Sequence, residues 1–127
     1  GYALDFAEDG REALTKIEAD PPQLVLLDVM MPEMDGYEVT RRVRQNSNLS
    51  YIPILLITAY EQVTVAAGLD TGADDFIRKP LEPEELSARV RSLLRLKHSI
   101  DERDRIAQQR EDFVSRLTHD LRTPLVA

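Results

Sequence analysis

The sequence predicts an α/β fold in which helices cover both faces of a parallel sheet, followed by one long helix. Residues 24–27 and 54–57 are uniformly apolar, as strands buried on both faces are. Segments with the helical spacing of apolar residues alternate with these strands along the chain. All five glycines and six of the seven prolines precede Leu86, so the turns lie in the first part and the remainder is typical of continuous helix.

Composition limits the class of protein. The chain has 127 residues, with 23 acidic side chains against 16 Lys and Arg, which gives a formal charge of −7. It has no cysteine, which excludes disulfide scaffolds, thiolate metal sites and cysteine nucleophiles. The acidic balance argues against nucleic-acid binding, because phosphate neutralisation needs a basic surface. No apolar run approaches the roughly 20 residues that span a bilayer, so we expect a cytoplasmic protein without a membrane segment.

The first four expected elements are a strand, a helix, a second strand and a second helix. Residues 2–6 alternate apolar with small or polar side chains, as a short half-buried strand does. Each helix starts with the capping-box spacing Asp-x-x-Glu, at residues 9–12 and at residues 35–38. Two adjacent prolines end the first helix, the buried strand 24–27 follows, and the second helix continues to about Gln45.

The next expected elements complete the sheet. Residues 54–57 form the second buried strand, a helix is expected over residues 61–68, and residues 75–77 form a third short strand. A long helical pattern then starts at Pro83, because proline is favoured in a first turn.

The two parts of the chain differ in charge as well as in turn content. Residues 1–96 carry 17 acids and 10 bases, whereas residues 97–127 carry six of each. We therefore expect one α/β domain over residues 1–96 and a helical segment over residues 97–127.

Three polar side chains follow three different predicted strands. Asp28, Thr58 and Lys79 each come directly after, or at the end of, a buried strand, and ligands of such sheets bind beyond the carboxyl ends of the strands. Taken singly, Asp28 is equally well explained as a turn cap, whereas Thr58 is better explained as a strand-end hydroxyl and Lys79 as a solvated charge. Together they supply a carboxylate nucleophile, a hydroxyl and a cation, which are the groups that phosphoryl transfer needs.

These residues carry a family resemblance. Leu24-Val-Leu-Leu-Asp28-Val-Met-Met-Pro-Glu-Met-Asp-Gly36, with Thr58-Ala59 and Lys79-Pro80, resembles a response-regulator receiver domain. The resemblance covers roughly residues 1–96 and implies a doubly wound, flavodoxin-type parallel sheet. It implies that Asp28 accepts a phosphoryl group from a phosphohistidine, that Lys79 contacts the phosphoryl oxygens or the carboxylate, and that Thr58 moves to hydrogen-bond the phosphoryl group.

Two further features follow from the resemblance. Phe76 matches an aromatic residue that turns inward with the threonine, although a plain core aromatic explains it equally well. The Lys79–Pro80 bond matches a cis peptide of the family.

The resemblance also has a gap at its start. A complete receiver begins with an additional strand and helix, and its first strand ends in two acids that hold Mg²⁺. This sequence starts after both elements, so we expect it to be part of a longer chain. By resemblance, Asp28 and the backbone carbonyl of Met30 remain as metal ligands. Because Mg²⁺ demands near-octahedral oxygen coordination, we expect its binding here to be weak or absent.

The C-terminal helix has a narrow apolar seam on a charged surface. The seam includes Ile100, Ile106, Phe113 and Leu117, beyond the point where a sheet could cover it. Such a seam is typical of a coiled coil, most simply with a second copy of the chain, and predicts a homodimer through this helix. His98 lies between Lys97 and Ser99 and is expected to be a solvated linker residue.

The second histidine lies in a motif. Residues 113–125, with His119-Asp-Leu-Arg-Thr-Pro124 at their centre, resemble the histidine box of sensor histidine kinases. The resemblance implies that His119 is phosphorylated from ATP, that Asp120 orients or deprotonates its ring, and that Thr123 positions water for phosphatase action. Pro124 is expected to kink the helix just past the histidine. ATP would bind only in the full-length kinase, so whether this chain acts as an enzyme stays open.

These resemblances predict a hybrid protein of a two-component phosphorelay. The receiver would accept phosphate on Asp28 and regulate an attached histidine kinase that phosphorylates itself on His119. Its partners would be a cognate histidine kinase or response regulator. The alternative is a degenerate receiver that is never phosphorylated and serves as a binding or dimerisation module.

Overall fold

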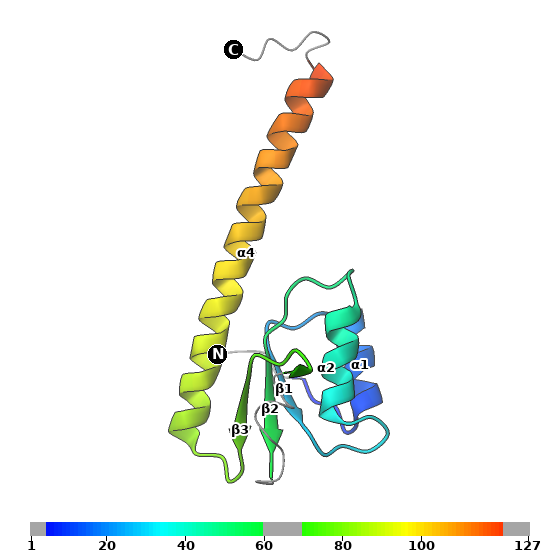
Figure 1. Cartoon of the computed structure of the whole chain (residues 1–127), viewed down its shortest axis with the longest axis vertical. Helices are drawn as coiled ribbons and strands as arrows, with labels where there is room; N and C mark the ends of the chain where they lie inside the picture. The colour runs from blue at the N-terminus through cyan, green and yellow to red at the C-terminus, as the bar shows by residue number, and fades with distance from the viewer. Residues whose placement is uncertain (1–4, 60–69, 121–127) are drawn as a thin grey trace. The chain divides into compact units, whose positions relative to one another are not determined.

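A computed structural model describes the backbone of residues 5–59 and 70–120 and the side chains of residues 5–59 and 70–110 (Figure 1). The chain divides into two compact units, Gly1–Lys97 and His98–Ala127. The helix that the sequence predicts over residues 61–68 lies outside the described residues, as do Tyr2 and Leu4 of the first predicted strand.

The first unit is built on a parallel sheet. Its three strands are β1 (Val25–Asp28), β2 (Ile54–Thr58) and β3 (Asp75–Arg78), in the spatial order β1-β2-β3. All pairing between them is parallel, so the predicted parallel sheet is confirmed for these strands.

Helices lie on both faces of this sheet (Figure 1). Helices α1 (Gly10–Ala19) and α2 (Gly36–Gln45) cover one face, and the first turns of α4 (Pro83–Asp120) cover the other. The larger core lies under α1 and α2 and contains Ile17, Leu27, Val39, Ile54 and Leu56, among others. The smaller core, under α4, consists of Leu55, Ile77 and Leu93 with partly buried neighbours.

Burial of the first apolar strand on both faces is the first prediction that the structure corrects. The side chain of Leu26 is 45% exposed, although its partner in register on β2, Leu55, is fully buried. The helix α4 packs over Leu55 and Ile77, whereas Leu26 is not among the residues packed against this smaller core. The uniformly apolar sequence of residues 24–27 indicated the strand correctly but not its position at the edge of the described sheet.

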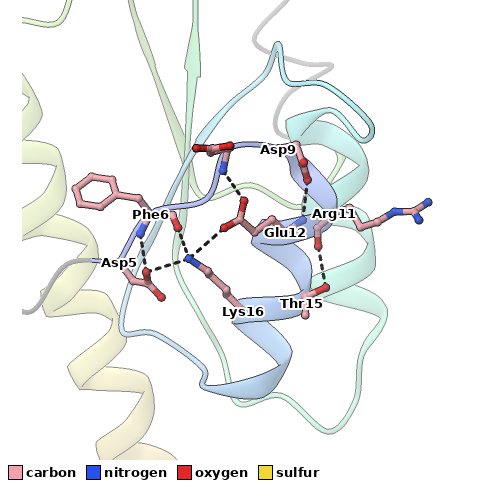
Figure 2. Close-up of polar contacts among 8 residues, drawn as sticks. Asp5, Phe6, Asp9, Arg11, Glu12, Thr15 and Lys16 are labelled. Atoms are coloured by element: carbon pink, nitrogen blue, oxygen red, sulfur yellow. Dashed lines mark hydrogen bonds and ion pairs between the residues drawn. The ribbon is translucent and has the colours of Figure 1, made fainter.

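The predicted strand over residues 2–6 is corrected only in its described part, residues 5 and 6. This part pairs with no strand of the described sheet, and Phe6 is 75% exposed. The segment is instead tied to α1 by Lys16 (Figure 2). The Lys16 ammonium contacts Asp5 Oδ1 at 3.1 Å and a Glu12 carboxylate oxygen at 3.2 Å, and it donates to the Phe6 carbonyl. Its hydrogen bond holds the pKa of Asp5 below its usual value. In the described part of this segment, the Phe6 carbonyl accepts from the Lys16 side chain and the Phe6 N–H donates to Asp5 Oδ1.

The predicted helix starts are confirmed by their caps. Asp9 Oδ1 accepts a hydrogen bond from the Glu12 N–H at 2.8 Å, and Asp35 Oδ1 accepts one from the Glu38 N–H at 2.9 Å. The first cap is not fully reciprocal, because the Glu12 carboxylate accepts from the N–H of Glu8 at 3.0 Å instead of from that of Asp9 (Figure 2).

Replacing Asp9 with alanine is expected to lower the free energy of unfolding by about 1 kcal/mol, because the Glu12 N–H loses its acceptor at the start of α1. Asp20→Ala is the matched control, since Asp20 contributes only its backbone N–H at the other end of the same helix. Urea denaturation of both variants tests this. Equal losses of stability would show that the cap contributes nothing specific.

A polar network lies at the N-terminal ends of β2 and β3. We call Arg44, Tyr51, Asp74 and Lys97 the Arg44 network. The Arg44 guanidinium of α2 donates to Asp74 Oδ2 at 2.7 Å, and the Tyr51 hydroxyl donates to Asp74 Oδ1. The Asp74 carboxylate also accepts from the N–H of Ile54 at 2.8 Å, at the first residue of β2. One carboxylate therefore joins α2, the loop before β2 and the start of β3.

The network continues into α4. Lys97, which the sequence places in the linker, is only 6% exposed, and its Nζ donates to the backbone carbonyl of Tyr51 at 2.6 Å. The Arg44 guanidinium carbon lies 5.2 Å from the centre of the Tyr51 ring. These contacts fasten the α4 segment within the first unit to the loop that leads into β2.

The Tyr51 hydroxyl gives this network a dependence on pH. Burial, with the hydrogen bond to Asp74 and its charge, raises the pKa of Tyr51 well above the ordinary value of 10.0. An unfolded tyrosine loses its proton near pH 10, whereas the folded state holds that proton to higher pH. The contribution of Tyr51 to stability is therefore complete below about pH 10 and falls as the pH rises above that value. Urea unfolding at several alkaline pH values should show this decline, and Tyr51→Phe should make it shallower; an unchanged slope in the variant would contradict the assignment.

Candidate functional site

The candidate site lies at the C-terminal ends of the strands. Asp28 is the last residue of β1, Thr58 is the last residue of β2, and Lys79 follows β3 directly. The structure brings Asp28 and Lys79 together, because Lys79 Nζ lies 2.7 Å from Asp28 Oδ2. The backbone N–H of Lys79 donates to the carbonyl of Thr58 at 2.8 Å, which fixes the lysine beside the end of β2.

Both oxygens of the Asp28 carboxylate have donors. Oδ2 accepts from Lys79, and Oδ1 accepts from the backbone N–H of Met30 at 3.0 Å. The side chain of Asp28 is 33% exposed and that of Lys79 is 44% exposed, so the pair is open to a solution reactant. An ion pair this exposed contributes little to stability, in general about 0–1 kcal/mol. The arrangement is thus better suited to chemistry at the carboxylate than to holding the fold together.

The two predicted switch residues lie close by along β2 and β3. Thr58 is 5% exposed, and Phe76 is partly buried against the larger core. The guanidinium carbon of Arg78 lies 5.9 Å from the centre of the Phe76 ring. The Lys79–Pro80 peptide bond is cis, as the resemblance implied.

The loop after Asp28, residues 29–35, is held by backbone contacts at both ends. The N–H of Val29 donates to the carbonyl of Ile57 at 2.9 Å, and the N–H of Gly36 donates to the carbonyl of Val29 at 3.1 Å. A Cβ on Gly36 would lie 2.6 Å from the carbonyl oxygen of Asp28, so only glycine fits where α2 begins. This close approach fixes the path of the chain directly after the carboxylate.

Sequence reasoning missed two residues of this region. Glu33 adopts a positive φ of 68°, and Gly10, the first residue of α1, contacts the loop at Pro32 and Met34. From the sequence, Gly10 is expected only as part of a helix start. A glycine directly after a helix cap, where a better helix former would be expected, was the one available signal for the close approach.

The described residues supply few of the side-chain ligands that a magnesium ion would use. Within residues 5–59 and 70–110, no group of three or more His, Cys, Asp or Glu side chains could hold a metal ion. Of the two predicted ligands, Asp28 has one oxygen 2.7 Å from the Lys79 ammonium, and Met30 would offer only its backbone carbonyl. An octahedral Mg²⁺ held here would take its remaining oxygen ligands from water or from other residues.

The histidine box lies largely beyond the described side chains. The backbone of α4 is helical through His119 and Asp120, their side chains are outside the described residues, and so are Thr123 and Pro124 entirely. Of the residues that are described, His98 is exposed and Ile106 is 41% exposed.

None of the helices in the described part of the chain combines the length and the apolar character of a membrane-spanning segment.

Comparison with known proteins gives one and the same family for the first unit. The family described as "Response regulator receiver domain" matches residues 1–91. The chain is 52% identical over 96 residues to the response regulator MprA of Mycolicibacterium vanbaalenii, covering 75% of this chain and 41% of that protein. It is 45% identical over 114 residues to MprA of Mycobacterium avium, covering 89% and 49%. The chain thus spans about half the length, or less, of these curated relatives.

Solved structures show the same similarity. The receiver domain of a signal transduction histidine kinase from Syntrophus aciditrophicus matches with a TM-score of 0.68 and 39% identity, over 74% of this chain and 72% of that one. The receiver domain of Francisella response regulator 1452 matches with a TM-score of 0.63 and 32% identity, over 70% and 73%. The predicted flavodoxin-type α/β fold is confirmed by these matches.

Proposed function

Because this chain belongs to the response regulator receiver domain family, we propose that it accepts a phosphoryl group on Asp28 within a two-component signalling pathway. The observation that carries the proposal is the contact between Lys79 Nζ and Asp28 Oδ2, at 2.7 Å and open to solvent at the C-terminal edge of the sheet. A carboxylate and a cation in this position are what acceptance of a phosphoryl group requires.

The proposed step is a displacement at phosphorus. A carboxylate oxygen of Asp28 forms a bond to the phosphorus of a phosphohistidine, the phosphorus–nitrogen bond breaks, and its electron pair returns to the imidazole nitrogen. The product is an acyl phosphate. Lys79 neutralises charge on the phosphoryl oxygens during the transfer, which is the main contribution that a protein makes to this class of reaction.

Thr58 and Phe76 are the proposed responders to phosphorylation. The Thr58 hydroxyl would donate to a phosphoryl oxygen, and Phe76, which is only partly buried, has room to change its packing. Charge-assisted hydrogen bonds contribute about 1.5–3 kcal/mol each. Two that form only in the phosphorylated state would shift a balanced conformational equilibrium by a factor on the order of hundreds or more.

The C-terminal segment supports a second proposal, that this receiver regulates a histidine kinase within the same protein. The support is the His119-Asp-Leu-Arg-Thr-Pro124 motif, the continuity of α4 from Pro83 to Asp120, and the similarity to a receiver domain of a histidine kinase. In this proposal His119 accepts phosphate from ATP bound elsewhere in the full-length protein, assisted by Asp120 and Thr123. The helix would pair with a second copy as a coiled coil in the cytoplasm, and the phosphorelay partners would be a cognate kinase or response regulator.

A direct experiment separates these proposals from a receiver that only binds partners. The full-length protein is incubated with Mg²⁺ and phosphoramidate, a small donor with a phosphorus–nitrogen bond, and the modified residue is located by peptide mass spectrometry. We expect one phosphoryl group on Asp28, labile to hydroxylamine as acyl phosphates are. A second incubation, with ATP, is expected to label His119. Absence of phosphate from Asp28 would favour the binding or dimerisation module.

A further inference from the structure

The first turn of α1 contacts the loop that follows the acceptor carboxylate. We propose that Gly10 is a positioning residue for phosphoryl acceptance, because its lack of a side chain allows α1 to hold residues 29–35 in the conformation that orients Asp28. This inference rests on the proposed function and adds a residue outside the Asp28, Thr58 and Lys79 set.

The contact is made by backbone on both sides. The N–H of Gly10 donates to the carbonyl of Pro32 at 3.3 Å. A Cβ on Gly10 would lie 1.8 Å from the carbonyl oxygen of Met34 and 2.6 Å from its carbonyl carbon. Real Cβ atoms essentially never approach other atoms below 3.0 Å, and a backbone carbonyl cannot rotate away as the end of a side chain can. Any side chain at this position must therefore displace either the loop or the start of α1.

The loop itself contains a strained turn that depends on outside support. The N–H of Met34 donates to the same Pro32 carbonyl at 2.7 Å, and the residue between them, Glu33, has a φ of 68°. This left-handed conformation is unfavourable for a residue with a side chain, and such residues persist when their surroundings hold them in place. The Gly10 contacts on either side of Glu33 supply that support.

The loop contacts the Asp28 carboxylate through the backbone of Met30. The N–H of Met30 donates to Asp28 Oδ1 at 3.0 Å, while Lys79 occupies the other oxygen. These two donors set the direction in which the carboxylate presents its lone pairs. A shift of Met34 that reaches Met30 would rotate the carboxylate away from in-line attack, and misplacement by about 1 Å can cost a hundredfold in rate.

The test compares Gly10→Ala with Gly72→Ala in the full-length protein. Gly72 is a matched control, because it also has a constrained backbone, with φ of 102°, and a Cβ there meets Arg44 Cγ at 2.8 Å in the Arg44 network. Both variants should lose stability. At a temperature where circular dichroism shows both to be folded, only Gly10→Ala should slow phosphorylation by phosphoramidate, by about ten- to a hundredfold at saturating donor. The donor concentration for half-maximal rate should stay unchanged, since Lys79 is intact.

A second pair of variants decides the question if Gly10→Ala does not fold. Glu33→Gly relieves the unfavourable positive φ and should fold at least as well as the wild type, but it makes the turn more flexible. Glu33→Gln is its control, because it removes the charge and leaves the backbone preference unchanged. Slower phosphorylation in Glu33→Gly than in Glu33→Gln, with a shifted Met30 amide resonance, supports positioning through the loop.

The outcomes separate this inference from the proposed function. If the wild type is not phosphorylated on Asp28, the proposed function fails. If the wild type is phosphorylated and Gly10→Ala matches Gly72→Ala, or Glu33→Gly matches Glu33→Gln where Gly10→Ala does not fold, the positioning role of Gly10 is overturned.

Discussion

Replacing Asp28 with asparagine is expected to abolish phosphoryl acceptance at this site while leaving the domain folded. An amide is not a competent nucleophile toward phosphorus, so the variant lacks the group that forms the acyl phosphate. The fold should be nearly unaffected, because the contact that is lost, the Asp28–Lys79 ion pair, is exposed. Phosphate-affinity electrophoresis after incubation with phosphoramidate measures the effect.

Asp35→Asn provides the matched control for this experiment. Asp35 lies seven residues further along the chain, and its Oδ1 caps α2 by accepting from the N–H of Glu38 at 2.9 Å. Asparagine caps helices about as well as aspartate does, so this variant removes a carboxylate near the site at little cost in stability. It should be phosphorylated at the wild-type rate. Labelling of Asp28→Asn at that same rate would move the phosphorylated residue elsewhere, with His119 as the first candidate.

Replacing Asp74 with alanine is expected to lower the free energy of unfolding by about 3 kcal/mol. The substitution leaves the Arg44 guanidinium, whose side chain is 24% exposed, without its carboxylate. It also removes the acceptor of the Tyr51 hydroxyl and that of the Ile54 N–H at the start of β2. Chemical denaturation of the variant and the wild type measures the difference.

Glu38→Ala is the control for the loss of stability measured in Asp74→Ala. Glu38 also pairs with arginines, Arg41 at 2.9 Å and Arg42 at 3.1 Å, but those side chains are 50% and 53% exposed. Its loss should therefore cost clearly less stability than the loss of Asp74. Folded Asp74→Ala should still be phosphorylated normally, because the Arg44 network lies at the opposite ends of the strands from Asp28. Similar destabilisation by the two variants would show that burial of the network adds nothing.

The features that could be predicted from sequence are those with a local cause. The caps at Asp9 and Asp35 follow from a side chain and a backbone N–H three residues apart, and the structure has both. The meeting of Asp28 and Lys79 follows from strand direction, since parallel strands end at the same edge of a sheet. These predictions needed no knowledge of packing between distant segments.

The features that could not be predicted depend on contacts between distant residues. The ion pair between Arg44 and Asp74 joins side chains 30 positions apart, and neither the residue types nor their spacing predicts it. The exposures of Leu26 and Phe6 depend on which segments lie beside them, which the pattern of apolar residues does not encode. The contact of Gly10 with Met34 likewise requires the tertiary arrangement of α1 and the loop.

Because the Asp28–Lys79 contact is exposed to solvent, the lysine can change its partner easily. Water and dissolved ions already compete for both groups, so separating them incurs only a small free-energy penalty. In the proposed function, Lys79 can therefore exchange the carboxylate for an arriving phosphoryl group without disturbing the strands that carry it.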